Sequence, residues 1–247
     1  MSGMLIAEYI LREKKANGTL PANGALVETI VTTDMAKAIA KAYGVKLIEV
    51  LTGFKYIGEQ IKFFEQQNSY EYVFGLEESY GCLAGTYARD KDACVAVMML
   101  CEVAAWCKSN GITLWDAMVS LYETYGYYKE GLETMTLKGM DGAEKIQSMM
   151  NEMRNNPPKK IGAWDVLALR DYKKDTRTDM TSGEVTPTGL PESNVLYYEL
   201  SNNAWCCVRP SGTEPKIKFY VGVKGDTLDG ADQMLEELKA EVLKHFE

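Results

Sequence analysis

The first half of the chain alternates short apolar runs with longer segments whose apolar residues recur at helical spacing. Apolar, β-branched runs bounded by turn residues predict buried strands, and the 3.6-residue period predicts amphipathic helices. The expected helices are residues 4–14, 32–43, 56–66, 92–109 and 113–125, and the expected strands are residues 25–31, 46–50 and 70–76. Strands that alternate with helices indicate an α/β fold, here a three-layer α/β domain with a mixed, largely parallel sheet.

The pattern changes after Gly126. The expected elements are a helix at residues 142–154, strands at 163–171, 195–200, 204–208 and 217–223, and a closing helix with an apolar stripe from Ala231 to Phe246. The last strand alternates apolar with polar residues, which is typical of a sheet with one covered face. We therefore expect a smaller α+β domain, with an antiparallel sheet covered by helices, and divide the chain into domains 1–133 and 134–247. Polar residues 173–194 are expected to form a long mobile loop.

Composition limits the function classes. A chain of 247 residues with 46% hydrophobic content can bury a core. The net charge of −8 argues against a broad basic surface for nucleic acid or an anionic membrane, but leaves room for a local cationic pocket. The apolar run at residues 93–107 is shorter than the roughly 20 residues that span a bilayer, and no signal-peptide pattern opens the chain.

The cysteines indicate the compartment. The six cysteines include no CxxC pair and the chain has one histidine, so a zinc site is not expected. Cys94 and Cys101 lie too far apart along one helix for a disulfide, and are interpreted as small buried hydrophobes in a reducing compartment. We therefore expect a cytoplasmic protein.

The segment from Arg209 to Lys216 joins two predicted strands and has the composition of a phosphate grip. Arg209 offers a planar fork for two phosphate oxygens, and Ser211 and Thr213 add hydroxyl donors. Gly212 lets backbone amides approach an anion, and Lys216 supplies a point charge. The alternative is a polar hairpin loop in which proline and glycine only turn the chain.

A second candidate site follows the strand predicted at residues 70–76, where α/β proteins place ligand loops. In an extended segment Glu77 and Ser79 point to the same side, so both can contact neighbouring hydroxyls of a sugar. The alternative is a solvated loop with helix-capping acids. Lys91 lies in a charged stretch before the long helix, and sequence spacing alone does not place it beside Glu77. The alternative interpretation is that Lys91 belongs only to the charged start of that helix.

Three motifs, taken in order, resemble the C-terminal half of the α-D-phosphohexomutases, the phosphoglucomutase and phosphomannomutase family. They are Thr52-Gly53-Phe54-Lys55, the Glu77-Glu78-Ser79 loop, and Arg209-Pro210-Ser211-Gly212-Thr213-Glu214-Pro215-Lys216. The resemblance covers nearly the whole chain and implies the third and fourth of the family's four domains. The family's phosphorylated serine, in a Ser-His-Asn type loop, and its Asp-x-Asp-x-Asp magnesium loop belong to the first two domains. Neither pattern occurs in this sequence.

The resemblance also implies roles for individual residues. Glu77 and Ser79 would bind the sugar hydroxyls. The phosphate that is not reacting would be held by Arg209, Ser211, Gly212 and Thr213, with Lys216 as a further candidate. Lys91 is the candidate acid or base, and no metal ligand is expected. Some phosphomannomutase-like members carry a histidine after the serine of the Glu-Glu-Ser loop, where this chain has Tyr80, and this difference favours glucose as the sugar.

The reaction that the resemblance implies interconverts hexose 1-phosphate and 6-phosphate by phosphoryl transfer through a bisphosphate. The full-length parent would be an isomerase that uses magnesium and glucose 1,6-bisphosphate. The chain, interpreted as truncated because it begins within a helix, is expected to be inactive alone. Its expected partners are a hexose phosphate and the N-terminal domains of the same protein, with no nucleic acid and no membrane. The alternatives are a free-standing phosphosugar-binding module, and the same mutase class acting on mannose or glucosamine phosphate.

Overall fold

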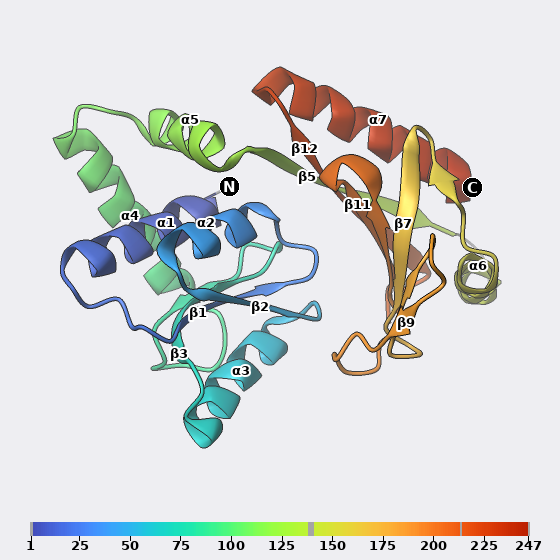
Figure 1. The fold of residues 1–247 in the computed structure, drawn as a ribbon, viewed down its shortest axis with the longest axis horizontal. Coiled ribbons are helices and arrows are strands. Elements are labelled where there is room, and N and C mark those ends of the chain that lie inside the picture. The colour runs from blue at the N-terminus through green and yellow to red at the C-terminus, as the bar shows by residue number, and fades with distance from the viewer. Residues whose placement is uncertain (1, 138–140, 213, 247) are drawn as a thin grey trace. The chain divides into compact units, whose positions relative to one another are not determined.

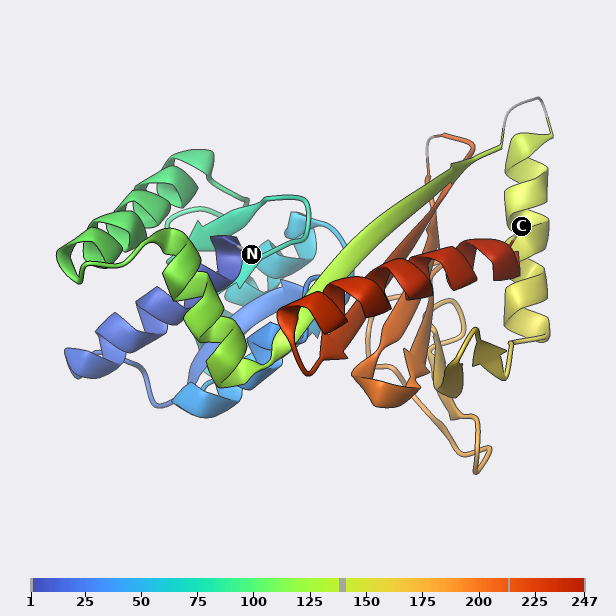
Figure 2. The ribbon, with the colours of Figure 1, turned by 90° about the horizontal axis from the view of Figure 1, so that it is seen from above.

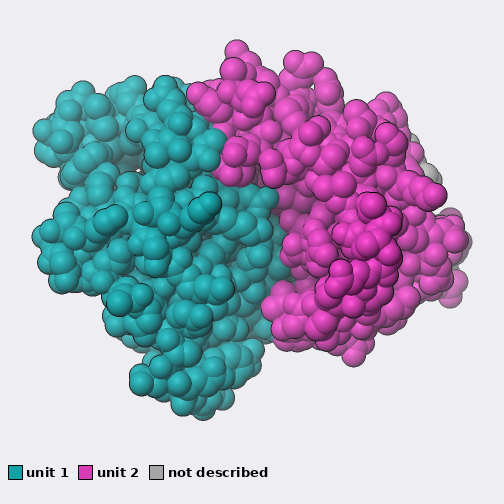
Figure 3. Space-filling model, in the orientation of Figure 1, with its two compact units in different colours: residues 1–126 teal, residues 127–247 magenta. Residues whose placement is uncertain are grey.

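The chain folds into two compact units. The computed structural model describes residues 2–137, 141–212 and 214–246, which are drawn as a ribbon in Figures 1 and 2. Unit 1 is residues 1–126 and unit 2 is residues 127–247, in separate colours in Figure 3. The division falls ahead of the boundary expected at residue 133, because the strand that begins at Tyr127 pairs with the last strand of unit 2.

The sheet of unit 1 has four strands in the order β2-β1-β3-β4. β1 (Gly24–Thr29) lies parallel between β2 (Lys46–Val50) and β3 (Glu71–Leu76), and β4 (Cys82–Ala84) runs antiparallel to β3. β1 is buried along its whole length, as expected of a central parallel strand that is covered on both faces. The predicted mixed, largely parallel sheet is confirmed.

Helices cover both faces of this sheet. The helices of unit 1 are α1 (Ser2–Ala16), α2 (Met35–Tyr43), α3 (Phe54–Gln67), α4 (Ala93–Ser109) and α5 (Leu114–Tyr125), of which α5 packs on α1, α2 and α4. In Figure 1, α3 lies on one side of the sheet, and α1 and α2 lie on the other. α3 buries Phe54, Ile57 and Ile61 in one core with Ala25 and Val27 of β1. Unit 1 therefore has the three layers that the alternating pattern predicts.

α4 departs from the burial that its sequence predicts. Asp92 caps the helix by accepting a hydrogen bond from the backbone N–H of Cys94 at 2.7 Å. The helix buries Val103 and Cys107, whereas Cys94 and Cys101 are exposed. The prediction that these two cysteines are buried is therefore wrong. A helix that is apolar on nearly every side is normally enclosed, and within unit 1 this one is covered on one side.

The sheet of unit 2 has eight strands, with seven in the order β5-β12-β11-β10-β7-β8-β9 and β6 paired to β7. Their bounds are β5 (Tyr127–Thr136), β6 (Lys160–Ile161), β7 (Trp164–Asp171), β8 (Thr176–Asp179), β9 (Val185–Thr186), β10 (Leu196–Leu200), β11 (Trp205–Pro210) and β12 (Lys216–Gly225). These pairings are antiparallel, which confirms the predicted α+β class.

Two helices pack on this sheet, α6 (Gly142–Asn155) and α7 (Leu228–Phe246). The stripe of α7 is buried as predicted, with Leu238 and Val242 fully enclosed. Val208 of β11 and Phe219 of β12 belong to the same core. α7 packs against β5 and β12, and Figure 2 shows it running alongside β5.

The longest strand that the sequence patterns did not predict is β5. It pairs with β12 along its full ten residues, from Tyr127 opposite Gly225 to Thr136 opposite Lys216. β5 is an edge strand, half-buried or exposed throughout, and it carries charged residues at Lys129, Glu130 and Glu133. Charge on an edge strand guards against pairing with other chains, but it also hides the strand from a search for apolar runs.

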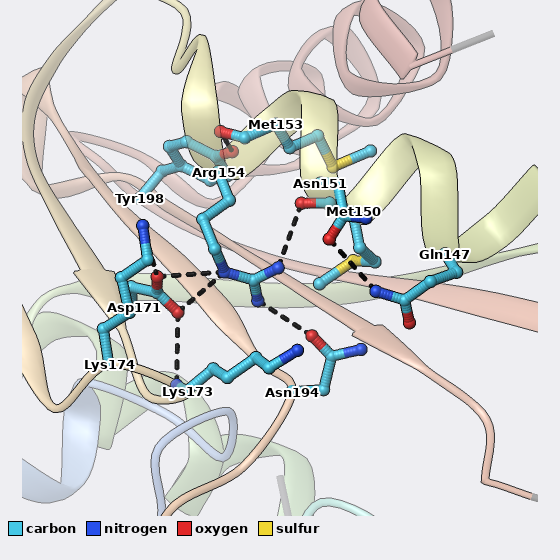
Figure 4. Close-up of polar contacts among 10 residues, drawn as sticks. All are labelled: Gln147, Met150, Asn151, Met153, Arg154, Asp171, Lys173, Lys174, Asn194 and Tyr198. Carbon is cyan, nitrogen blue, oxygen red and sulfur yellow. Dashed lines mark hydrogen bonds and ion pairs between the residues drawn. The ribbon is translucent and has the colours of Figure 1, made fainter.

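The prediction of a long mobile loop at residues 173–194 is wrong in part, because β8 and β9 form there and extend the sheet. A buried ion pair fixes both ends of this segment (Figure 4). Nε of Arg154 donates to the Asp171 carboxylate at 2.9 and 3.0 Å, and Nη2 of Arg154 donates to Oδ1 of Asn194 at 2.8 Å. Asp175 accepts hydrogen bonds from the backbone N–H groups of Thr188 and Gly189. Polar side chains thus order a segment that has few apolar residues.

Candidate functional site

The predicted phosphate grip is the turn between β11 and β12. The backbone N–H of Ser211 donates to the carbonyl of Lys216 at 2.8 Å, which closes the turn at the end of the strand ladder. Oγ of Ser211 accepts from the backbone N–H of Glu214 at 3.3 Å. Gly212 is exposed, and a Cβ placed on it would meet nothing within 4 Å. Thr213, the fourth residue predicted for this grip, lies outside the described residues.

The strand register collects cations on one face of the sheet. Arg209 stands directly opposite Lys218 across the β11–β12 pair. Their neighbours Val208 and Phe219 point into the core under the helices, so Arg209 and Lys218 project from the opposite face. Lys216 follows the same alternation as Lys218, which places it on that face too.

Lys218 lies outside the Arg209–Lys216 motif, so that motif does not predict it. The signal that would have found it is the alternation of β12: with Ile217 and Phe219 in the core, the lysines on either side of Ile217 face the other way. The structure therefore brings Arg209 together with Lys218, and Lys216 joins them at the end of the strand.

Lys216 shares its turn with a carboxylate. Its Nζ lies 3.1 Å from Oε2 of Glu214 in the same turn. A carboxylate this close offsets much of the positive potential that Lys216 adds to the turn. Lys216 therefore stays the weaker candidate for binding an anion that the sequence predicts.

The Glu77 loop begins where β3 ends. The backbone N–H of Glu77 donates to the carbonyl of Gly81 at 2.9 Å, so the chain turns back within five residues. Tyr80 sits at the tip with a φ of +67° and a side chain that is 96% exposed. The segment is therefore a turn, and the premise that Glu77 and Ser79 share a side because the chain is extended is wrong.

Within this turn Glu78 makes the side-chain contacts. Its carboxylate accepts from Oγ1 of Thr29 at 2.9 Å and from Oγ of Ser79 at 3.2 Å. Thr29 is the last residue of β1, so Glu78 ties the loop to the carboxyl end of the neighbouring strand. Ser79 is exposed, and its hydroxyl is engaged with Glu78 rather than with Glu77.

The structure brings Lys91 to Glu77, which sequence spacing could not do. A Cβ placed on Gly81 would lie 2.5 Å from Oε1 of Glu77 and 2.8 Å from Cδ of Lys91, so both side chains approach the bare glycine backbone. Nζ of Lys91 also lies 3.2 Å from Oδ1 of Asp90 and 6.0 Å from the centroid of the Phe54 ring.

The charges around Glu77 affect its proton affinity. Burial raises the pKa of Glu77 above its ordinary value, the neighbouring carboxylates of Glu78 and Asp90 raise it further, and Lys91 opposes them. A carboxyl held this way is suited to exchange hydrogen bonds with hydroxyl groups, because it can both accept and, when protonated, donate.

A close approach between backbones positions the segment that carries Lys91. Gly58 of α3 lies against the backbone carbonyl of Arg89 so closely that a Cβ at residue 58 would overlap it. Nη2 of Arg89 in turn donates to Oε1 of Glu65 on α3 at 2.6 Å. The helix that carries the end of the Thr52-Gly53-Phe54-Lys55 motif thus fixes the approach to Lys91.

A cavity of about 160 Å³ lies between α1, α4 and α5, and none of the predicted site residues lines it. The Arg12 guanidinium lies 3.7 Å from the centroid of the Trp106 ring and pairs with both Glu8 and Glu13. Because two carboxylates neutralise this arginine, the cavity does not suit an anionic sugar phosphate.

The described part of the chain has no cluster of three or more His, Cys, Asp or Glu side chains that could hold a metal ion. In the same described ranges no single helix is long and apolar enough to cross a membrane, although the bent pair α4 and α5 passes that test by length and composition.

Comparison with known proteins connects both units to one group of enzymes. A sequence profile described as phosphoglucomutase/phosphomannomutase, alpha/beta/alpha domain III, matches residues 1–125. A phosphoglucomutase of Staphylococcus epidermidis is 35% identical over 235 residues, which are 95% of this chain and 42% of that protein. A phosphoglucomutase of Staphylococcus aureus is 35% identical over 213 residues, 86% of this chain and 38% of that protein. The chain thus spans less than half the length of these relatives.

Comparison of the fold with solved structures also finds phosphoglucomutases. The open form of pp63/parafusin, a phosphoglucomutase from Paramecium, matches with a TM-score of 0.58 over 97% of this chain and 41% of its own, at 16% sequence identity. At that identity the likeness concerns the fold alone. It extends over both units, and so over both candidate loops.

Proposed function

The chain belongs to the phosphoglucomutase/phosphomannomutase family, and from that premise we propose that it is the substrate-holding C-terminal half of a phosphoglucomutase. In this proposal unit 1 corresponds to the third domain of the family and unit 2 to the fourth. The parent enzyme interconverts hexose 1-phosphate and hexose 6-phosphate through a bisphosphate intermediate. The chain alone binds the hexose phosphate and is inactive.

The observation that carries the proposal is the placement of Arg209 and Lys218 in direct register, on the side of the β11–β12 pair opposite the core that α6 and α7 cover. An arginine fork and an ammonium group side by side suit the three oxygens of a phosphate ester. Ser211 and the backbone of Gly212 stand at the end of the same ladder and add neutral donors. In the proposal this turn, with Thr213, holds the phosphate that is not reacting.

Glu77, Ser79 and Lys91 form the sugar side of the proposal. The raised pKa of Glu77 and its closeness to Lys91 support a role in contacting hydroxyls and in moving a proton. Ser79 has to exchange its bond with Glu78 for one with the sugar. Tyr80 in place of a histidine supports glucose over mannose.

The chemistry that this half does not carry is assigned to the rest of the parent. The phosphoryl donor serine and the magnesium loop would lie in its N-terminal domains, and glucose 1,6-bisphosphate would be the intermediate and activator. The present residues contribute positioning, because a phosphate held at one end of the sugar orients the other end for transfer. The protein is proposed to work in the reducing cytoplasm, which its six free cysteines support.

Titration of glucose 1-phosphate into the 247-residue chain, followed by calorimetry, tests this function. Arg209→Ala is expected to weaken binding about tenfold or more, because hydrogen bonds to charged groups contribute about 1.5–3 kcal/mol. Lys244→Ala is the control, since it removes an exposed cation on α7 that pairs with Glu241. Equal affinity in the two variants contradicts the proposed phosphate grip.

Three further measurements decide between the alternatives. Mannose 1-phosphate and glucosamine 1-phosphate, titrated in parallel, are expected to bind more weakly than glucose 1-phosphate; the reverse order supports the same mutase class with another sugar. The chain alone is expected to give no turnover of glucose 1-phosphate, and turnover by the pure protein contradicts the assignment of the phosphoryl donor to another part. A free-standing binding module is supported if fusion to the rest of a relative restores no activity.

A further inference from the structure

One face of α4 exposes an apolar stripe that unit 1 leaves uncovered. Along the 17 residues of the helix only Glu102, Lys108 and Ser109 are polar. Val97 is 64% exposed and Met98 is 55% exposed. With Cys94 and Cys101 these residues follow the spacing i, i+3, i+4 and i+7, so they lie on one side of the helix. We call these four residues the α4 stripe.

The buried side of α4 is already accounted for. Val103 and Cys107 are its buried residues, and the helix contacts α1, α5 and β4 within unit 1. Figures 1 and 2 show α4 beside α1 and leading into α5. At 1.5 Å per residue the seven steps from Cys94 to Cys101 extend about 10 Å along the helix, so the exposed apolar residues lie next to one another on one side of α4.

We propose that the α4 stripe is the surface on which the remaining part of the mutase polypeptide packs against unit 1. This inference rests on the proposed function. Two observations select this occupant. The chain spans 42% of the Staphylococcus epidermidis relative, so most of that polypeptide lies outside the matched region and is available to cover an apolar face. The stripe carries no charge, so its partner is expected to offer an apolar surface of similar length.

The stripe contains its own probes, because Cys94 and Cys101 are exposed whereas Cys82 and Cys107 are buried. Burial also raises the pKa of the Cys82 and Cys107 thiols, which lowers their reactivity further and makes them internal controls. Thiol labelling followed by mass spectrometry then reports whether the stripe is covered at its two cysteines, Cys94 and Cys101.

The experiment compares the 247-residue chain with a fusion in which the unmatched part of the Staphylococcus epidermidis relative is joined to it. Labelling of Cys94 and Cys101 is expected to be about tenfold slower or more in the fusion, with Cys82 and Cys107 slow in both. Val97→Lys is expected to restore fast labelling of the fusion while leaving the isolated chain folded. Val185→Lys is the matched control, because Val185 is 57% exposed and lies on β9 of unit 2.

Other occupants give different results, and each overturns the inference. Protection of the isolated chain that grows with its concentration, together with a dimer in sedimentation, assigns the stripe to a second copy. Protection on addition of phosphatidylcholine–phosphatidylglycerol vesicles assigns it to a membrane surface. Equal labelling of the folded fusion and the isolated chain leaves the stripe without a role in packing.

Turnover of glucose 1-phosphate by the fusion separates this inference from the proposed function. Protection without turnover supports the packing surface and counts against the proposed function. Turnover without protection supports the proposed function and overturns the packing surface.

Discussion

The Arg209 turn and the Glu77 loop both extend from the end of a strand, but their charges are held in different ways. Arg209 and Lys218 project from a ladder of backbone hydrogen bonds, so the strand register sets the spacing of their backbones. Glu77 belongs to a turn whose neighbour Glu78 is bonded to Thr29, and Lys91 reaches it from a separate segment. A site fixed by register keeps its geometry as long as the sheet is intact, whereas a site assembled from three segments depends on their packing.

This difference matches the two tasks proposed for the regions. A phosphate needs strong, fixed cations, and the antiparallel sheet supplies them on one face. A sugar that is presented in two orientations needs hydroxyl contacts that adapt, and a turn with partly buried carboxyls supplies them. Substitutions that disturb the packing or the ion pairs supporting each region test this comparison.

The largest effect on stability is expected from loss of the buried ion pair between Arg154 and Asp171 in unit 2. Arg154→Met removes the guanidinium from the Asp171 carboxylate, whose side chain is 5% exposed, and leaves the Lys174 ammonium at 3.9 Å beside it. Removal of one partner of a buried pair costs about 3–5 kcal/mol. We expect the free energy of unfolding of unit 2, measured with urea, to fall by that amount. Lys160→Met is the control: its pair with Asp165 is exposed, and such pairs contribute about 0–1 kcal/mol. Equal effects of the two variants would show that the Arg154 pair does not hold the sheet.

A smaller loss of stability is expected when the close contact between Gly58 and Arg89, which positions the segment beside the Glu77 loop, is disturbed. Gly58→Ala forces a Cβ against the backbone carbonyl of Arg89, and overpacking of this kind costs about 1–3 kcal/mol. Urea unfolding of unit 1 measures that cost. The matched variant is Gly212→Ala in the Arg209 turn, where the added Cβ meets nothing within 4 Å, and its stability should stay within about 0.5 kcal/mol of the parent chain. If Gly212→Ala is the more damaging variant, the comparison between the two regions is reversed.

The two lysines near Arg209 should contribute unequally to phosphate binding. Lys218→Ala removes a cation that stands beside Arg209, and a charge at about 4 Å contributes about 1 kcal/mol or more near a protein surface, which is about a fivefold loss of affinity for glucose 1-phosphate. Lys216→Ala should lose less, because Glu214 already offsets that charge. Calorimetry in low and in high salt measures both. A larger loss for Lys216→Ala would contradict the ranking of the two cations.

The smallest effect is the pH dependence that Glu77 gives to unit 1. Because the pKa of Glu77 is raised in the folded state, the folded chain binds its proton more tightly than the unfolded chain does. Its contribution to stability is therefore complete below the ordinary carboxyl pKa and is lost as the pH rises through the raised value. Glu77→Gln should flatten this part of the stability profile. A profile of the parent chain that rises over the same window would assign the dependence to other groups.

Much of the fold is predictable from periodicity, and the exceptions have physical reasons. The parallel strands of unit 1 are apolar because both faces are covered, so short apolar runs identify them. β5 is an edge strand with charged residues, and its pairing with β12 depends on residues about ninety positions away, which no local pattern reports. The exposure of Cys94 also escapes a local pattern, because an apolar helix looks the same whether or not it is covered.

The candidate site divides in the same way. The Arg209–Lys216 motif predicts the turn, since its residues are adjacent in the chain. The alternation of apolar and polar residues in β12 predicts that Lys218 lies on the face opposite the core. The approach of Lys91 to Glu77 depends on the packing of Gly58 against Arg89, which joins segments far apart in sequence. The motifs therefore identify Glu77 and Lys91 as candidates, but no local pattern predicts that the two side chains lie close together.

Mapping of backbone amide shifts by NMR, as glucose 1-phosphate is added to the 247-residue chain, tests the central claim most directly. We predict that the largest shifts fall on the amides from Arg209 to Lys218, with a second group from Glu77 to Lys91. Shifts confined to other surfaces, such as the cavity that Arg12 and Trp106 line, would contradict the claim that cations in strand register hold the phosphate.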